Sequence, residues 1–328
     1  MLETSASRSR RPRPLWRRLL GPVVIVVLLA IAFIVLQRTA REIRFEDVRA
    51  AIVATPNSAI LLSILFTVLS FGALAAYDML AVRASVRDPV PMRTAAFAGA
   101  AGYAFSNALG FPVMTGVSVR YRIYSASGLR VADITRVVTM SWAAFWLGCA
   151  LVMGVFVVIE PHSIADSLGL PPAVARLIGF AILGIIASLI AWVSSGERTL
   201  TLFNWHLDLP DRHTALAQLA AGAFDFLGAG AALYVLLPEA AQPAIGTFAV
   251  VFASALTLGI ISHTPGGIGV FEATLISGLG IDAGPALLGS LILFRVIYYL
   301  LPLIVAFAAM VWAEIVLRRR RRRRARPQ

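Results

Sequence analysis

The chain has 328 residues, of which 59% are hydrophobic and 14% charged, with a formal net charge of +12 at pH 7. This composition lies far outside that of soluble globular proteins and indicates a polytopic membrane protein, for which nucleic acid is not an expected partner. All 29 basic residues are Arg, and a single cysteine, Cys149, excludes a disulfide within one chain.

Six apolar segments are long enough to cross a hydrocarbon core about 30 Å thick. These predicted spans are 19–37, 59–80, 137–159, 173–193, 214–237 and 285–312. Two further apolar segments, interrupted by Gly and Pro, are predicted to be broken helices, 94–119 and 244–280. The polar segments between them are expected to be loops, among them 81–93, 120–136 and 194–213. The Arg-rich ends are expected to be cytoplasmic tails of one transmembrane domain, 19–316, the tails being 1–18 and 317–328.

A repeat relates the two broken segments. Ser106-Asn107-Ala108-Leu109-Gly110 aligns with Ser262-His263-Thr264-Pro265-Gly266 at an offset of 156 residues, and the same offset aligns the flanking spans. Each half, about 19–160 and 173–314, then contains three spans and a broken pair. If each broken pair is re-entrant, a half crosses the membrane three times and the second half is inverted. The predicted fold class is therefore an all-α polytopic membrane protein with two inverted repeats.

The distribution of Arg agrees with this topology. With the N-terminus inside, the predicted cytoplasmic segments hold 23 of the 29 Arg residues, and the external loops hold four, all within 38–49. Positively charged residues favour the cytoplasmic side of a membrane. We expect a bacterial inner-membrane protein with both termini in the cytoplasm. The two broken hairpins should enter from opposite faces and meet near the midplane.

The segment Ser262–Glu272, Ser-His-Thr-Pro-Gly-Gly-Ile-Gly-Val-Phe-Glu, is the strongest candidate for a site. One proline and three glycines break the helix, and lipid cannot satisfy the freed backbone groups. The break must therefore lie inside protein or beside a water-filled cavity. His263 and Glu272 add ionisable groups to it, as in the substrate sites of transporters. Glu272 could bind a cationic headgroup or a proton; the alternative is a carboxylate that marks a helix terminus.

Arg120 and Arg122 form a second candidate, next to Tyr124. Two guanidinium groups at the inner interface could clamp a lipid phosphate through paired hydrogen bonds. The alternative is an ordinary positively charged loop with interfacial tyrosines.

Asp225 lies in the middle of a span, where a carboxylate is costly and commonly functional. It could bind substrate or a proton, or it could pair with Arg295, which also lies within a span. Asp78 is close to the end of its span and is expected at the membrane interface.

No motif indicates an enzyme. The four His residues are scattered, no cluster has metal-ligand spacing, and neither a phosphate-cradling loop nor a nucleophile motif occurs. The longest polar segment, 194–213, is too short for a catalytic domain. We expect no catalytic site, no metal and no cofactor.

Three stretches resemble a known family: Gly102–Gly110 (Gly-Tyr-Ala-Phe-Ser-Asn-Ala-Leu-Gly), Arg120–Tyr124 (Arg-Tyr-Arg-Ile-Tyr) and Ser262–Glu272. Over roughly residues 15–315 the chain resembles the transmembrane flippase domain of the multiple peptide resistance factor MprF, the lysylphosphatidylglycerol synthetase/flippase. The same domain occurs alone in YbhN-like membrane proteins. The resemblance implies movement of aminoacylated phosphatidylglycerol between leaflets, with site residues at Arg120, Arg122 and Glu272. We expect no synthase activity, because the synthetases carry an additional aminoacyl-transferase domain.

The leading hypothesis is a flippase-like transporter that moves a phospholipid, with or without an aminoacyl group, between leaflets. Its candidate substrate-binding residues are Arg120, Arg122, Tyr124, Asp225, His263, Pro265, Gly266, Gly267, Glu272 and Arg295. Two alternatives are a transporter of a small polar solute and a non-transporting membrane partner of a separate lipid-modifying synthase or envelope enzyme. No ATPase motif is present, so transport would be ion-coupled or downhill. Membrane phospholipid is the expected partner, and a homo-oligomer is compatible with the sequence.

Overall fold

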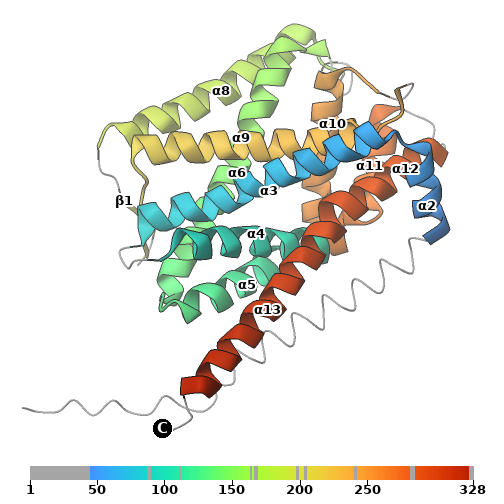
Figure 1. Ribbon diagram of the computed structural model, residues 1–328. Helices are drawn as coiled ribbons and strands as arrows, with labels where there is room; N and C mark the ends of the chain where they lie inside the picture. Colours follow the sequence, from blue (N-terminus) through green and yellow to red (C-terminus); the bar gives the residue numbers. More distant parts are fainter. Residues whose placement is uncertain are drawn as a thin grey trace, which may run out of the picture.

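A computed structural model describes residues 45–86, 90–110, 112–162, 165, 169–196, 199–202, 205–239, 242–280 and 285–324. Within these ranges the chain forms a bundle of helices and one short β-hairpin (Figure 1). The elements are α2 (Phe45–Ala54), α3 (Asn57–Ser85), α4 (Met92–Leu109), α5 (Pro112–Ala126), α6 (Val131–Ile159), α8 (Pro172–Ser194), β1 (Thr199–Leu202), β2 (Trp205–Asp208), α9 (Arg212–Tyr234), α10 (Ile245–Ile261), η2 (Pro265–Gly267), α11 (Val270–Leu279), α12 (Pro285–Phe294), the π-helix η3 (Arg295–Leu300) and α13 (Leu301–Arg324).

Five helical segments are long and apolar enough to cross a membrane: Asn57–Ser85, Val131–Ile159, Pro172–Ser194, Arg212–Tyr234 and Ala286–Val316. They match five of the six predicted spans. The sixth, 19–37, and the tail 1–18 lie outside the described residues. The helix α8 buries only Ala175, Gly179 and Ile186, so most of its apolar surface faces outward, as expected for a helix in contact with lipid.

Two details differ from the predicted all-α organisation. The segment expected to be a loop, 194–213, contains the antiparallel pair β1 and β2. At the C-terminus, α13 continues through Arg324, so the arginine-rich tail predicted from residue 317 begins as an extension of the last helix. The coarse prediction of a helical membrane protein is confirmed.

Both segments that were predicted to be broken are helical hairpins. The helix α4 ends at Gly110, which has a φ of 69°, and α5 folds back so that Gly102 and Gly116 flank one side chain, that of Arg120. In the second hairpin, Gly266 and Gly267 have φ values of 60° and 66°. This left-handed conformation is readily available only to glycine, which explains why glycine marks both breaks.

The two breaks meet inside the protein. A Cβ on Gly266 would lie 3.5 Å from the carbonyl oxygen of Ala108 and 3.6 Å from that of Asn107. The element order α3–α4–α5–α6 recurs as α9–α10–α11 and α12 to α13, and α3 packs along α9 (Figure 1). The predicted repeat therefore agrees with the order of the helices, whereas the inversion of one half relative to the other stays a prediction.

A glycine contact fixes α9 against α6. A Cβ on Gly148 would lie 2.1 Å from the carbonyl carbon of Gly222, and a Cβ on Gly222 would lie 2.2 Å from the carbonyl oxygen of Ala144. Small residues allow the two backbones to touch, which is a common way for membrane helices to associate. This contact lies one turn before Asp225 and places that carboxylate at the centre of the bundle.

Candidate functional site

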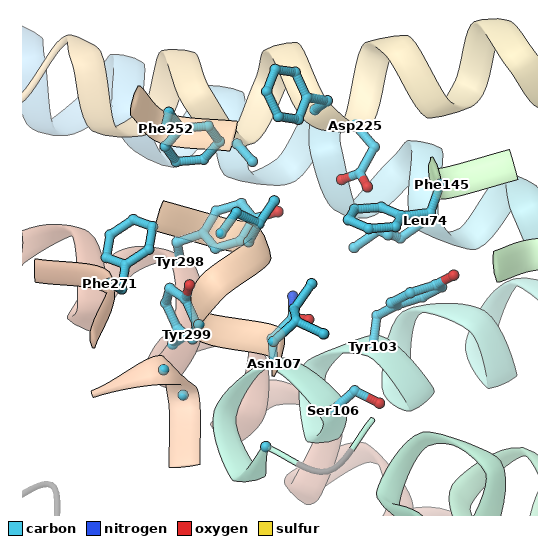
Figure 2. Close-up of a pocket in the computed structure, with 18 of the residues that line it drawn as sticks. Leu74, Tyr103, Ser106, Asn107, Phe145, Asp225, Phe252, Phe271, Tyr298 and Tyr299 are labelled. Atoms are coloured by element: carbon cyan, nitrogen blue, oxygen red, sulfur yellow. The ribbon is translucent and has the colours of Figure 1, made fainter. Parts of the chain in front are cut away.

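A cavity of about 110 Å³ lies where the two breaks meet. Figure 2 shows Asp225 above it, Tyr298 and Tyr299 on one side, and Tyr103 on the other. Aromatic residues are the largest group in its wall: Tyr103, Trp142, Phe145, Trp146, Phe226, Phe252, Phe271, Phe294, Tyr298 and Tyr299. A few polar residues interrupt that wall: Ser106, Asn107, Asp225, His263 and Thr264. A largely apolar cavity with a few convergent polar groups is typical of a ligand site.

Asp225 is 3% exposed, and its hydrogen-bond donors among the described residues are hydroxyl groups. Ser70 donates a hydrogen bond to Oδ1 (2.6 Å) and Tyr77 donates one to Oδ2 (3.1 Å). The hydroxyl of Ser70 lies 2.8 Å from that of Tyr298, which joins the group to η3. The alternative in which Asp225 pairs with Arg295 does not hold, because hydroxyl groups of α3 bind this carboxylate and Arg295 binds another one.

Arg295 pairs instead with Glu272. Its Nη1 also donates to the carbonyl oxygen of Gly266 (3.1 Å), and the carboxylate of Glu272 accepts from the backbone N–H of Gly269 (2.9 Å). Glu272 therefore caps the first turn of α11, as in a capping box, and at the same time ties the break to η3. Glu272 thus lies at a helix terminus, as the alternative interpretation of the sequence states, and it also forms an ion pair with Arg295.

The break itself forms part of the cavity wall. His263, Gly266 and Gly267 line the cavity, and the backbone of Pro265 belongs to the same turn. Among the described residues His263 is the one non-glycine residue with a positive φ, 54°, and its Nδ1 lies 2.6 Å from the carbonyl oxygen of Ile261. A non-glycine residue held in this backbone conformation costs on the order of 1–3 kcal/mol, and such residues are frequent at functional sites.

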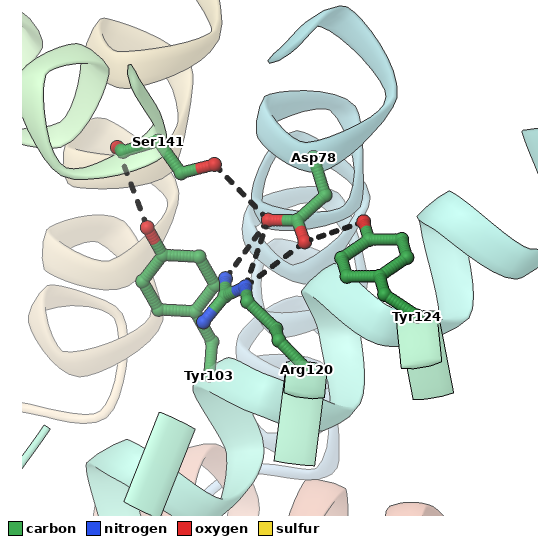
Figure 3. Close-up of polar contacts among 5 residues, drawn as sticks. All are labelled: Asp78, Tyr103, Arg120, Tyr124 and Ser141. Atoms are coloured by element: carbon green, nitrogen blue, oxygen red, sulfur yellow. Dashed lines mark hydrogen bonds and ion pairs between the residues drawn. The ribbon is translucent and has the colours of Figure 1, made fainter. Parts of the chain in front are cut away.

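Arg120 is 1% exposed and forms a buried ion pair with Asp78 (Figure 3). Its Nε and Nη2 each donate to the carboxylate at 2.9 Å. Tyr124 and Ser141 donate to the same carboxylate at 2.8 Å and 3.1 Å. The guanidinium carbon lies 4.5 Å from the ring centroid of Tyr103, a residue of the cavity wall. Asp78 was expected at the membrane interface; its helix continues to Ser85, and its side chain is 0% exposed and therefore buried within the protein.

Arg122 binds a different partner, Glu314 on α13, at 2.9 Å. The segment expected to be a loop, 120–136, is helical up to Ala126, which turns Arg120 and Arg122 in different directions. The two arginines therefore do not form a joint phosphate clamp in this structure. Gly102 makes room for Arg120, since a Cβ there would lie 2.7 Å from Nη1.

Among the predicted site residues, the structure brings Asp225, His263, Gly266 and Gly267 to the cavity, and Glu272 and Arg295 immediately behind its break. Their binding of substrate stays a prediction. Sequence reasoning missed the hydroxyls that surround Asp225. A polar stripe on α3 at helical spacing was the available signal, consisting of Ser63, Thr67, Ser70, Tyr77 and Asp78, all buried.

Comparison with known proteins adds two relatives, whereas no protein-family model matches the chain. The chain is 31% identical over 231 residues to the uncharacterized protein slr0712 of Synechocystis sp., covering 70% of this chain and 71% of that protein. It is 29% identical over 300 residues to the inner membrane protein YbhN of Escherichia coli, covering 90% and 92%. Neither name mentions a flippase, and the resemblance to MprF stays a prediction. The chain belongs to the family of membrane proteins represented by slr0712 and YbhN.

Proposed function

We propose that this protein is a flippase-like transporter that moves a phospholipid between the leaflets of a bacterial inner membrane. The observation that carries the proposal is the cavity at the meeting point of two broken helical hairpins. Broken helices inside a bundle expose backbone groups that can bind polar substrate, and transporters commonly place their sites there. The relative YbhN is named an inner membrane protein, which supports the location.

The walls of the cavity favour a lipid. Trp146 lines the cavity and is also 38% exposed, and Val155 farther along the same helix is exposed to the same extent. The aromatic wall therefore continues to the apolar outer surface of α6. We propose that the headgroup enters the cavity while the acyl chains stay in the membrane. Asp225, Asn107 and His263 would contact the headgroup.

The ion pairs described above would act as supports in this proposal. Arg120 and Asp78 hold Tyr103 from behind, and Glu272 and Arg295 hold the second break. The aminoacylated lipid of the resemblance is one candidate substrate. We propose a transport role without catalysis, both termini in the cytoplasm, and a separate synthase as a partner if the substrate is a modified lipid.

A small polar solute is the second candidate. A cavity of about 110 Å³ is small, and its polar groups could orient a small polar solute. A solute transporter would use the same residues without an opening toward lipid.

Leaflet exchange in proteoliposomes tests the proposal. Vesicles would carry labelled lysyl-phosphatidylglycerol, phosphatidylglycerol or a zwitterionic lipid, and a membrane-impermeant reagent would report the outer leaflet. We expect faster exchange of at least one lipid than in vesicles with an unrelated membrane protein. Uptake of labelled polar solutes without lipid exchange would favour the second candidate. Neither activity, with or without an imposed ion gradient, would favour the non-transporting partner.

A further inference from the structure

The carboxylates in the helical core differ in how their charge is balanced. Asp78 pairs with Arg120, and Glu272 pairs with Arg295. Asp225 is 3% exposed, and its hydrogen-bond partners among the described residues are the neutral hydroxyls of Ser70 and Tyr77. It is therefore the buried acidic group for which no arginine supplies a compensating charge in the described part of the chain.

The other groups that face Asp225 also carry no fixed positive charge. They are Tyr77 on α3, Tyr103 on α4, Cys149 on α6 and Tyr298 on η3, with His263 on the cavity wall. From α10 the side chains that share the cavity with Asp225 are apolar, and the one charged residue of α8, Arg176, is exposed. The ion pair between Asp78 and Arg120 lies behind Tyr103 and is internally balanced.

An ionised carboxylate in such surroundings is costly, because no arginine of the described chain compensates for the hydration that it loses on burial. Binding one proton removes the charge while the hydroxyl groups continue to supply hydrogen-bond partners. The side chain also lines the cavity, so a proton can reach it by the route that substrate uses. Buried acidic groups in these positions are common in proton relays of transporters.

We propose that Asp225 is a proton-binding site that couples transport to the proton gradient. The inference rests on the proposed transport function. One proton binds a carboxylate oxygen from one side of the membrane and leaves from the same oxygen to the other side, without covalent change in the protein. The cavity changes readily between opening to one side of the membrane and opening to the other only while Asp225 is neutral. An ionised Asp225 would carry a buried charge without a compensating positive charge during that change.

A proton fits this site better than a sodium ion. Transporters bind sodium with backbone carbonyls from unwound helices, and α9 is continuous from Arg212 to Tyr234. Both carboxylate oxygens of Asp225 already accept from hydroxyl donors, so each has less capacity left to coordinate a metal ion.

The first test detects the proton itself and does not need transport. Infrared difference spectra of the purified protein, recorded over a pH titration, should show the carbonyl stretch of a protonated carboxylic acid in an apolar site. The band should disappear in Asp225→Asn and persist in Asp211→Asn. Asp211 is the matched control, because it is the exposed N-cap of the same helix and Asn caps helices equally well. Absence of a titrating band that depends on Asp225 would overturn the proposal.

The second test measures coupling in proteoliposomes. For one proton per lipid, a difference of about one pH unit across the membrane should shift the steady-state leaflet ratio about tenfold. Asp225→Asn should lose this response at whatever rate it exchanges lipid, whereas Asp211→Asn should keep it. Exchange in the wild type that ignores the pH gradient, or that follows a sodium gradient instead, would refute proton coupling and leave the proposed function intact. If none of the lipids exchanges, the proposed function is refuted, and the infrared band alone decides whether Asp225 binds a proton.

Discussion

Asp78→Ala is expected to destabilise the folded protein by about 3–5 kcal/mol, because it leaves the Arg120 guanidinium buried without its counter-charge. Arg120 is 1% exposed and cannot turn toward water without unpacking α5 from α4. The substitution also removes the acceptor for Tyr124 and Ser141. Thermal unfolding of the purified protein in detergent, compared with the wild type, measures the loss.

Two further variants control for this prediction. Glu314→Ala breaks the ion pair between Glu314 and Arg122, whose side chains are 22% and 20% exposed, and should destabilise the protein less than Asp78→Ala. Asp78→Leu combined with Arg120→Met should recover much of the stability, because replacing a buried ion pair with apolar groups is often neutral. Wild-type stability of Asp78→Ala alone would show that the buried pair is not what holds α3, α4, α5 and α6 together.

Glu272→Ala and Arg295→Ala should each slow lipid exchange at least about tenfold, which corresponds to a barrier higher by roughly 1.4 kcal/mol. Either change releases the second break. Glu272→Ala removes the ion-pair partner of Arg295 and the carboxylate that caps the backbone N–H of Gly269. Arg295→Ala removes the hydrogen bond to the carbonyl oxygen of Gly266 and the ion-pair partner of Glu272. Because both changes break one linked group, the double variant should be little slower than the slower single variant. Exchange rates in proteoliposomes, measured for all three variants, check this.

The choice of lipid separates two roles for Glu272. If Glu272 binds a cationic headgroup, as the sequence suggests, Glu272→Gln should slow the exchange of a cationic lipid more than that of an anionic one. The ion pair with Arg295 and the cap on α11 indicate a positioning role, so we expect similar losses for both lipids. The exposed Glu239 offers a control, since Glu239→Ala should exchange lipid at the wild-type rate. Wild-type exchange by Glu272→Ala would contradict the account of this group.

The sequence allows the helices and their breaks to be predicted well, because both depend on local chemistry. Apolar runs of sufficient length predict five of the described spans, and Gly110, Gly266 and Gly267 mark the turns that only glycine tolerates. The loop expected over 120–136 is the main local error. Arginines suggested a solvated segment there, whereas Arg120 is compensated by a partner 42 residues away.

The partners within the site could not be predicted in the same way. The hydrogen bond from Ser70 to Asp225 joins residues 155 positions apart, and it depends on the packing of α3 against α9. The sequence identifies Asp225, Glu272 and Arg295 as unusual in apolar surroundings but does not determine which acid faces which base. The π-helix that carries Arg295 toward Glu272 also has no sequence signal in this chain.

Lipid exchange by a matched pair of tryptophan variants tests the central claim, that substrate passes through the cavity between the two breaks. Leu256 on α10 lines the cavity, and Leu258 on the same helix is 46% exposed on the outer surface. Leu256→Trp should fill the cavity and slow exchange at least about tenfold, a barrier higher by roughly 1.4 kcal/mol, whereas Leu258→Trp should exchange at the wild-type rate. Equal, wild-type exchange by both folded variants would contradict transport through this cavity.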